Sequence, residues 1–262
     1  MKKILLIIAI ALSLNATQIT LGVVPQQSPL KLSKKWSKVT EYLYNETGIE
    51  VVFKTERSIP KFEKELYAGK YDISYMNPYH FIVAKNEQNY TAFTRANKNI
   101  VGIVLSKNKE VEFTKENLMG KKFLFPAPNA FAATLLPKLE FKEKFGIDID
   151  KDTKVLYVNS HDSVYKGISR DIEYLGGGIV RTFNNFTAKN DKEKLNIVYK
   201  TSPYPSHPIA AHPRVSKEIV AKIQKAFIDM PSEIKKTLSI KAFKAIDSSE
   251  YDIIKSLAVD NK

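Results

Sequence analysis

Apolar positions along the chain recur with two different periods, and the changes between these periods outline strands and helices in alternation. Short apolar runs typical of strands lie at 19–24, 49–53 and 70–76. Between the first two runs, residues such as Trp36 and Leu43 recur at helical spacing over 31–46. A second helix is expected to begin at Ser58 and to end at Gly69. This alternation predicts a doubly wound, mostly parallel α/β sheet flanked by helices.

A strand at 100–105 has no helix directly before it, which indicates that the chain crosses there into a second lobe. Further apolar runs typical of strands lie at 123–125, 155–158 and 195–199. Asn129 is expected to cap a long helix that Pro137 bends or interrupts. The predicted organisation is lobe 1 from 17–104 plus 205–262 and lobe 2 from 105–204, with crossings near 103–108 and 199–206.

Residues 1–16 have the composition of a secretory signal peptide. Lysines follow Met1, an unbroken apolar run covers 4–12, and Ala16 offers a small residue for cleavage. The run is too short to span a bilayer, although a buried first strand or a retained anchor would show the same pattern. The sequence contains no cysteine, hence no disulfide and no lipid-modified cysteine. We therefore expect a secreted, periplasmic protein that is not lipid-anchored.

The net charge of +13 is compatible with nucleic acid, a membrane surface or an anionic ligand as partner. The lysines are spread along the chain and form no basic run, so no nucleic-acid partner is expected. The charge is better explained by solvation and by weak attraction of small anions.

Residue types needed for catalysis or metal binding do not occur in productive patterns. The chain has four histidines, at His80, His161, His207 and His212. They form neither an HExxH motif nor a pair at helical spacing. Ser160-His161-Asp162 is not a catalytic triad, because adjacent residues cannot align as nucleophile, base and orienting group. The glycines at 176–178 match no phosphate-binding motif and most simply allow close packing or a positive φ. We therefore expect no enzyme, no metal and no cofactor.

The stretch 71–81 combines a strand with a helix start. Asn77 is a good N-cap and Pro78 suits the first helical position, so a helix is expected to begin directly after the strand. Such a turn exposes backbone N–H groups at the carboxyl end of a strand, where open α/β sheets bind ligands. Polar and aromatic residues crowd this turn, namely Tyr75, Asn77, Tyr79 and His80. The stretch is predicted to form half of a small-molecule binding site.

Similar polar caps recur at the other predicted strand-to-helix turns, at Gln27, Asn129, Ser160 and His161. If the lobes face each other, all these helix starts point into one cleft that suits a small oxyanion. His161 could be neutral in the empty site and charged against an anion. Arg181, one turn into the predicted helix after the glycines, could also reach an anion. Each cap and Tyr75 could equally serve the fold alone.

Four parts of the chain carry motifs that occur together in one known family. They are Gly22-Val-Val-Pro-Gln-Gln-Ser-Pro29 with Trp36, the stretches 59–63 and 69–72, Tyr75-Met-Asn-Pro-Tyr-His80, and Gly176-Gly-Gly-Ile-Val-Arg-Thr-Phe183. Together they resemble PhnD-type periplasmic binding proteins of phosphate, phosphite and phosphonate ABC transporters. The resemblance covers about 19–230. It implies a type II two-lobed fold that closes on its ligand at a hinge. It also implies ligand contacts from the Tyr75–Tyr79 turn, the helix start near 129 and the Ser160-His161 turn.

The chain departs from this family's usual pattern at two places. Consecutive Ser or Thr residues are replaced by Pro-Ala-Pro-Asn-Ala at 126–130, which leaves backbone N–H groups and Asn129. Before the glycines, the usual Asp-Ala is replaced by Tyr174-Leu175, with Glu173 one position away. These departures leave the exact ligand open, an aminophosphonate included.

The resemblance implies a periplasmic solute-binding protein of an ABC importer, which captures a small phosphate- or phosphonate-like anion by hinge closure. Its partners would be the anionic ligand and an inner-membrane ABC permease, and a monomer is expected. The alternative is a sensory binding protein that presents its ligand to a membrane histidine kinase or similar receptor. A secreted enzyme with the same two-lobed fold is a third hypothesis.

Overall fold

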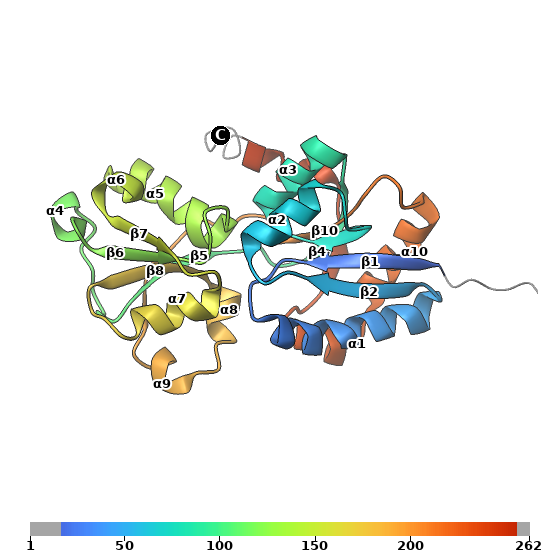
Figure 1. Cartoon of the computed structure of the whole chain (residues 1–262), viewed down its shortest axis with the longest axis horizontal. Coiled ribbons are helices and arrows are strands. Elements are labelled where there is room, and N and C mark those ends of the chain that lie inside the picture. Colours follow the sequence, from blue (N-terminus) through green and yellow to red (C-terminus); the bar gives the residue numbers. More distant parts are fainter. Residues whose placement is uncertain (1–16, 256–262) are drawn as a thin grey trace, which may run out of the picture.

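The chain builds two β-sheets that lie side by side, each with helices on both faces (Figure 1). The structure is a computed structural model that describes residues 17–255, so the predicted signal peptide lies outside the described residues. Within this part of the chain, none of the helices combines the length and apolar character that a membrane-spanning helix requires. The two-lobed α/β fold class predicted from the sequence is confirmed.

The first sheet has the strand order β11-β4-β10-β3-β1-β2. Its strands are β1 (Gln18–Val23), β2 (Glu50–Thr55), β3 (Ile73–Tyr75), β4 (Thr91–Ala96), β10 (Pro208–Ala211) and β11 (Phe243–Ala245). One face carries α1 (Pro29–Thr47), α10 (Lys217–Asp229) and α11 (Ser232–Thr237). The other carries α2 (Ile59–Tyr67), α3 (Pro78–Gln88) and the 3-10 helix η2 (Ser248–Ile254).

The second sheet has the strand order β7-β6-β8-β5-β9. Its strands are β5 (Gly102–Ser106), β6 (Lys122–Phe125), β7 (Lys154–Tyr157), β8 (Tyr174–Ile179) and β9 (Asn196–Lys200). Helix α4 (Lys115–Leu118) lies at the far end, and the π-helical turn η1 (Phe131–Leu135) continues into α5 (Leu136–Phe145) and is followed by α6 (Ile149–Asp152). Helices α7 (His161–Ile168), α8 (Val180–Asn184) and α9 (Lys189–Lys192) cover the opposite face (Figure 1).

Both sheets are mixed, with parallel pairing only among the strands that helices connect. Strand β1 pairs in parallel with β2 and β3, and β6 with β7 and β8. The strands next to the crossings run antiparallel to their neighbours, as β5 does to β8 and β10 to β3. A strand that enters from the other sheet arrives in the opposite direction, so parallel pairing is less extensive than predicted.

The connections between the sheets run through 97–101 and 201–207. They pair with each other at Ile100 and Tyr204, whose N–H groups donate to each other's carbonyl oxygens at 2.8 and 3.0 Å. The first connection was expected at 103–108, but β5 lies in the second sheet over its whole length. The apolar run that marks β5 gives no sign of which sheet it joins, because either sheet would bury it.

The glycines at 176–178 lie inside β8 and allow η1 to approach the sheet closely. A Cβ on Gly177 would lie 1.7 Å from the Ala133 carbonyl oxygen. That carbonyl would bond the N–H of residue 137 in an α-helix, but Pro137 has none. The predicted interruption of the helix is confirmed, since η1 gives way to α5 at Leu136. A helix follows the glycines as expected, since α8 begins at Val180. The glycines themselves lie in strand β8, and none of them has a positive φ.

Candidate functional site

Polar groups from both sheets meet in a cavity of about 10 Å³ between them. Its polar lining comes from Gln26 after β1, Asn77 after β3, the backbone of 130–133, His161 at the start of α7, and His207 in the second connection. The helix starts predicted to share a cleft at Asn77 and His161 do so. Neither Asp nor Glu lines this cavity.

Asn77 connects the two halves of the cleft. Its Oδ1 accepts a hydrogen bond from the backbone N–H of His80 at 2.7 Å, which makes it the N-cap of α3 as expected. Its Nδ2 donates to the backbone carbonyl oxygen of Asn129 at 2.9 Å. Asn129 itself does not cap the helix, contrary to the prediction. The N-cap position is Ala130, because the π-helical turn begins at Phe131, one residue later than an Asn129 cap requires.

Three of the predicted site residues support the turns without lining the cavity. The ring of His80 is fully buried, and its Nε2 lies 2.9 Å from Glu63 Oε1. Tyr79 packs edge-on against the same ring. Ser160 caps α7, since its Oγ accepts from the backbone N–H of Ser163 at 3.1 Å. These residues orient Asn77 and His161, which reach the cleft.

The two histidines in the cavity lining are held neutral. Burial and the nearby Arg181 guanidinium lower the pKa of His161 to about 3, and its Nδ1 lies 3.3 Å from Thr182 Oγ1. Burial, followed by the charge of Arg181, lowers the pKa of His207 well below its usual value. A neutral imidazole can still donate one hydrogen bond to an anion.

A chain of hydrogen bonds shows independently that Nε2 of His207 carries no proton, because it accepts a hydrogen bond. Arg181 Nη2 donates to Gln26 Oε1 at 3.0 Å, which identifies the oxygen of that amide. The amide nitrogen of Gln26 therefore faces His207 Nε2, 3.1 Å away, and donates to it.

The same histidine stacks on Tyr75 with ring centroids 5.2 Å apart. Arg181 also lies over the Tyr75 ring, 5.8 Å from its centroid.

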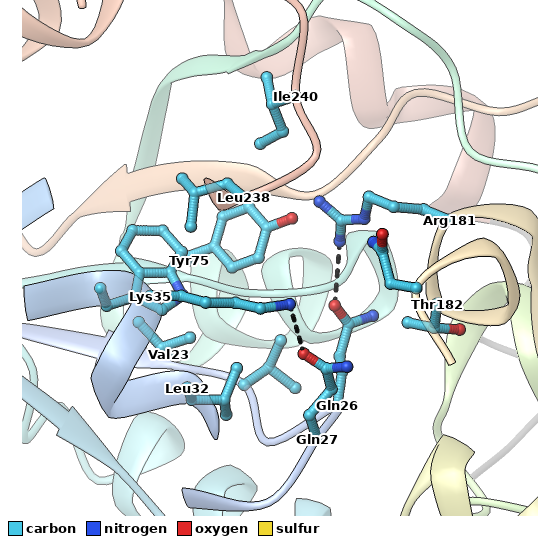
Figure 2. Close-up of a pocket in the computed structure, with 13 residues that line it drawn as sticks. Val23, Gln26, Gln27, Leu32, Lys35, Tyr75, Arg181, Thr182, Leu238 and Ile240 are labelled. Carbon is cyan, nitrogen blue, oxygen red and sulfur yellow. Dashed lines mark hydrogen bonds between the residues drawn. The ribbon is translucent and has the colours of Figure 1, made fainter. Parts of the chain in front are cut away.

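The cleft widens beside Arg181 into a second cavity of about 40 Å³ (Figure 2). Gln27 lies here, and its Oε1 accepts a hydrogen bond from Lys35 Nζ at 2.8 Å. Arg181 enters from α8 of the opposite sheet, and Thr182 follows it. The predicted residues Gln27, Tyr75 and Arg181 thus meet at one end of the cleft.

The chain matches, over residues 21–251, the family described as ABC transporter, phosphonate, periplasmic substrate-binding protein. This protein belongs to that family. The match spans nearly the whole chain, so the resemblance stated from the sequence is confirmed. The family is one of binding proteins and not of enzymes, works in the periplasm, and serves a membrane permease. Residues 1–16, predicted as the signal peptide, lie outside the matched range.

Solved structures of other proteins share this fold. A binding protein component of an ABC phosphonate transporter from Pseudomonas aeruginosa is 16% identical, with a TM-score of 0.81 over 94% of this chain and 87% of that one. PhnD1 from Prochlorococcus marinus, solved with methylphosphonate, is 15% identical, with a TM-score of 0.82 over 93% and 98%. A Xanthomonas citri protein bound to chloride has 14% identity and a TM-score of 0.67, over 92% and 96%.

Sequence reasoning missed several residues that line this binding protein's cleft. His207 was considered as a metal ligand and not as a residue of the cleft, although its place at the end of the return crossing was the signal that it faces the cleft. Gln26 was considered only as part of the stretch at 22–29. Lys35 was not singled out, because one more lysine on a helix carries no signal. Among residues 17–255, no group of His, Asp and Glu side chains is arranged to bind a metal ion.

One ion pair also joins the two halves of the binding protein. Lys31 Nζ on α1 lies 2.6 Å from Asp162 Oδ2 on α7. A partly exposed pair of this kind contributes up to about 1 kcal/mol. We therefore expect Asp162→Asn to favour separation of the lobes and to weaken ligand binding up to about fivefold. Calorimetry would measure the affinity, and small-angle scattering the dimensions of the free protein. Unchanged values in both would exclude a role in closure.

Proposed function

We propose that this protein captures a small phosphonate-like oxyanion in the cleft between its sheets and delivers it to the permease of an ABC importer. The observation that carries the proposal is a cavity shared by both sheets, with hydrogen-bond donors from each and no carboxylate in its lining. Such a lining favours an anion over a cation or a zwitterion. Family membership favours transport over the sensory alternative.

Backbone amides at the start of η1 take the place of the Ser and Thr hydroxyls that the chain lacks at 126–130. The first N–H groups of a helix have no acceptor within it, which leaves those of 131–133 for a ligand. The same residues are buried and line the central cavity. Asn77 and His161 add side-chain donors from opposite sides. Several hydrogen bonds to one oxyanion suit the three oxygens of a phosphonate.

Binding requires the two lobes to move apart. A cavity of about 10 Å³ has room for about one water, which is less than a phosphonate group occupies. The connections paired at Ile100 and Tyr204 provide the pivot. The contacts that would break on opening are Asn77 to Asn129, Lys31 to Asp162, and Arg181 to Gln26. On closure the Lys31–Asp162 pair re-forms, while Asn77 and Arg181 turn to the ligand. Closure on a captured ligand is thus part of the proposed mechanism.

The remaining parts of the proposal concern export and assembly. We infer that residues 1–16 are the signal peptide, that cleavage follows Ala16, and that the mature protein is a monomer without a lipid anchor. The basic start and apolar run support the first inference. Amino-terminal sequencing of the exported protein would test the cleavage, and sedimentation would test the monomer.

The ligand class is tested by thermal shift. Methylphosphonate, phosphite or phosphate is expected to raise the melting temperature, because a ligand that binds only the folded state stabilises it by RT ln(1 + [L]/Kd). At a hundred times the dissociation constant this amounts to about 2.7 kcal/mol. Sulfate and acetate at equal ionic strength serve as controls. If none of the phosphorus oxyanions shifts the transition, the proposed ligand class is wrong.

A further inference from the structure

One end of the cleft carries two positive charges that no acid neutralises. This cationic corner is formed by Gln26, Gln27, Lys35, Tyr75 and Arg181. Figure 2 shows Lys35 and Arg181 reaching toward each other from opposite sheets, each ending at a glutamine. The cavity between them has a volume of about 40 Å³.

Among residues 17–255, neither Lys35 nor Arg181 forms an ion pair. Asp162, the acid that favours the charge on Lys35, is bound by Lys31 at 2.6 Å. Burial and then the Arg181 charge lower the pKa of Lys35. No Asp or Glu lines the corner or the central cavity. The same holds for a third cavity of about 390 Å³, which lies beside the connections at 97–101 and is also lined by Tyr75 and Arg181. The two cations therefore repel each other in a partly desolvated place, and an anion there would relieve the repulsion.

The corner adjoins the central cavity through a shared wall. Gln26 lines both cavities, and it receives the Arg181 hydrogen bond on one side and donates to His207 on the other. The Arg181 charge also reaches His161, because it lowers the pKa of that ring. One ligand can therefore place a phosphonate group among the central donors and a second group beside Arg181.

The chemistry of the corner selects that second group. A guanidinium presents a planar fork that matches a carboxylate, and a lysine ammonium adds a point charge. The amide oxygens of Gln26 and Gln27 now accept from these cations, and both amides can turn away from an incoming anion. A ligand amine would instead meet two like charges. A volume of about 40 Å³ suits a compact planar group.

We propose that the ligand is a phosphonate whose short substituent ends in a carboxylate, and that Arg181 and Lys35 bind this carboxylate. The proposal rests on the proposed function and specifies its substrate class. The tethered carboxylate makes the cations part of the ligand's recognition, and it explains why the cleft carries no acid to receive an amine.

The test is calorimetric titration of the wild-type protein with methylphosphonate, phosphonoacetate and 2-aminoethylphosphonate at equal ionic strength. Phosphonoacetate is expected to bind about 10- to 100-fold more tightly than methylphosphonate, and 2-aminoethylphosphonate more weakly than either. The readout for variants is the ratio of the phosphonoacetate and methylphosphonate affinities. Arg181→Gln and Lys35→Gln should each reduce this ratio about tenfold. Lys35→Arg should keep most of it.

Lys34→Gln is the matched control, because Lys34 lies exposed beside Lys35 on α1 and should leave the ratio unchanged. Tight methylphosphonate binding with no gain for phosphonoacetate would overturn the carboxylate proposal and leave the proposed function standing. Loss of both affinities in equal proportion in Arg181→Gln would also overturn it. Binding of none of the three compounds by the wild-type protein would overturn the proposed function itself.

Discussion

Replacing Gly177 by alanine is expected to reduce the free energy of unfolding by about 3 kcal/mol or more and to abolish ligand binding. The added Cβ would lie 1.7 Å from the Ala133 carbonyl oxygen and 2.7 Å from the Phe125 ring. The backbone of η1 cannot yield without leaving the sheet, because Ala133 is buried against it. Since η1 also supplies the amides proposed to bind the oxyanion, the same displacement removes the ligand's donors.

Gly167→Ala is the matched control for this substitution. Its Cβ would meet one Leu124 methyl carbon at 2.6 Å, and a leucine side chain can turn aside where a backbone carbonyl cannot. We therefore expect a loss of less than about 1 kcal/mol and retained binding. Urea denaturation measures both stabilities, and calorimetry measures ligand affinity. A similar small loss in both variants would mean that η1 does not depend on close contact with β8.

These glycines also show where sequence reasoning was sufficient and where it failed. Three consecutive glycines suggested close backbone approach, and Pro137 suggested an interrupted helix, yet nothing in the sequence indicated that the two features face each other. Their partnership depends on the pairing of β8 with β5 and β6, which brings together residues far apart in the chain. The periodicity of apolar residues predicted the strands and helices, because each of them buries one face of its own. The same periodicity could not predict which sheet β5 joins.

The residues of the binding cleft also differ in whether the sequence could predict them. Asn77 and His161 were predictable because local cap chemistry places them at helix starts that open α/β sheets aim at a common edge. His80 was misleading, because it shares that turn but points at Glu63. Lys35 was not predictable, since its role depends on Arg181 from the other sheet. Local signals thus identify groups at strand ends, and only the packing of the lobes decides which of them face the cleft.

Lowering the pH from 6.5 to 4.5 is expected to reduce the free energy of unfolding by about 1.4 kcal/mol per pH unit for each histidine that the fold keeps neutral. Burial and the Arg181 charge lower the pKa of His161 to about 3, and burial lowers the pKa of His207 well below its usual value. In this window the unfolded chain takes up protons at both rings and the folded chain does not. This part of the free energy of unfolding is therefore fully present above pH 6.5 and is lost as the pH falls.

The comparison of wild type with His161→Gln isolates one of these protons, because glutamine keeps a polar side chain that cannot titrate. The slope between pH 4.5 and 6.5, from urea denaturation at each pH, should fall by about 1.4 kcal/mol per pH unit. Lowered carboxyl pKa values, as at Asp72 and Glu140, begin to act at the acid end of this window, and they contribute equally to the slopes of wild type and variant. Equal slopes would mean that His161 is already charged in the folded protein. A bound oxyanion favours imidazolium, so saturating methylphosphonate should flatten the wild-type slope and leave that of the variant less affected.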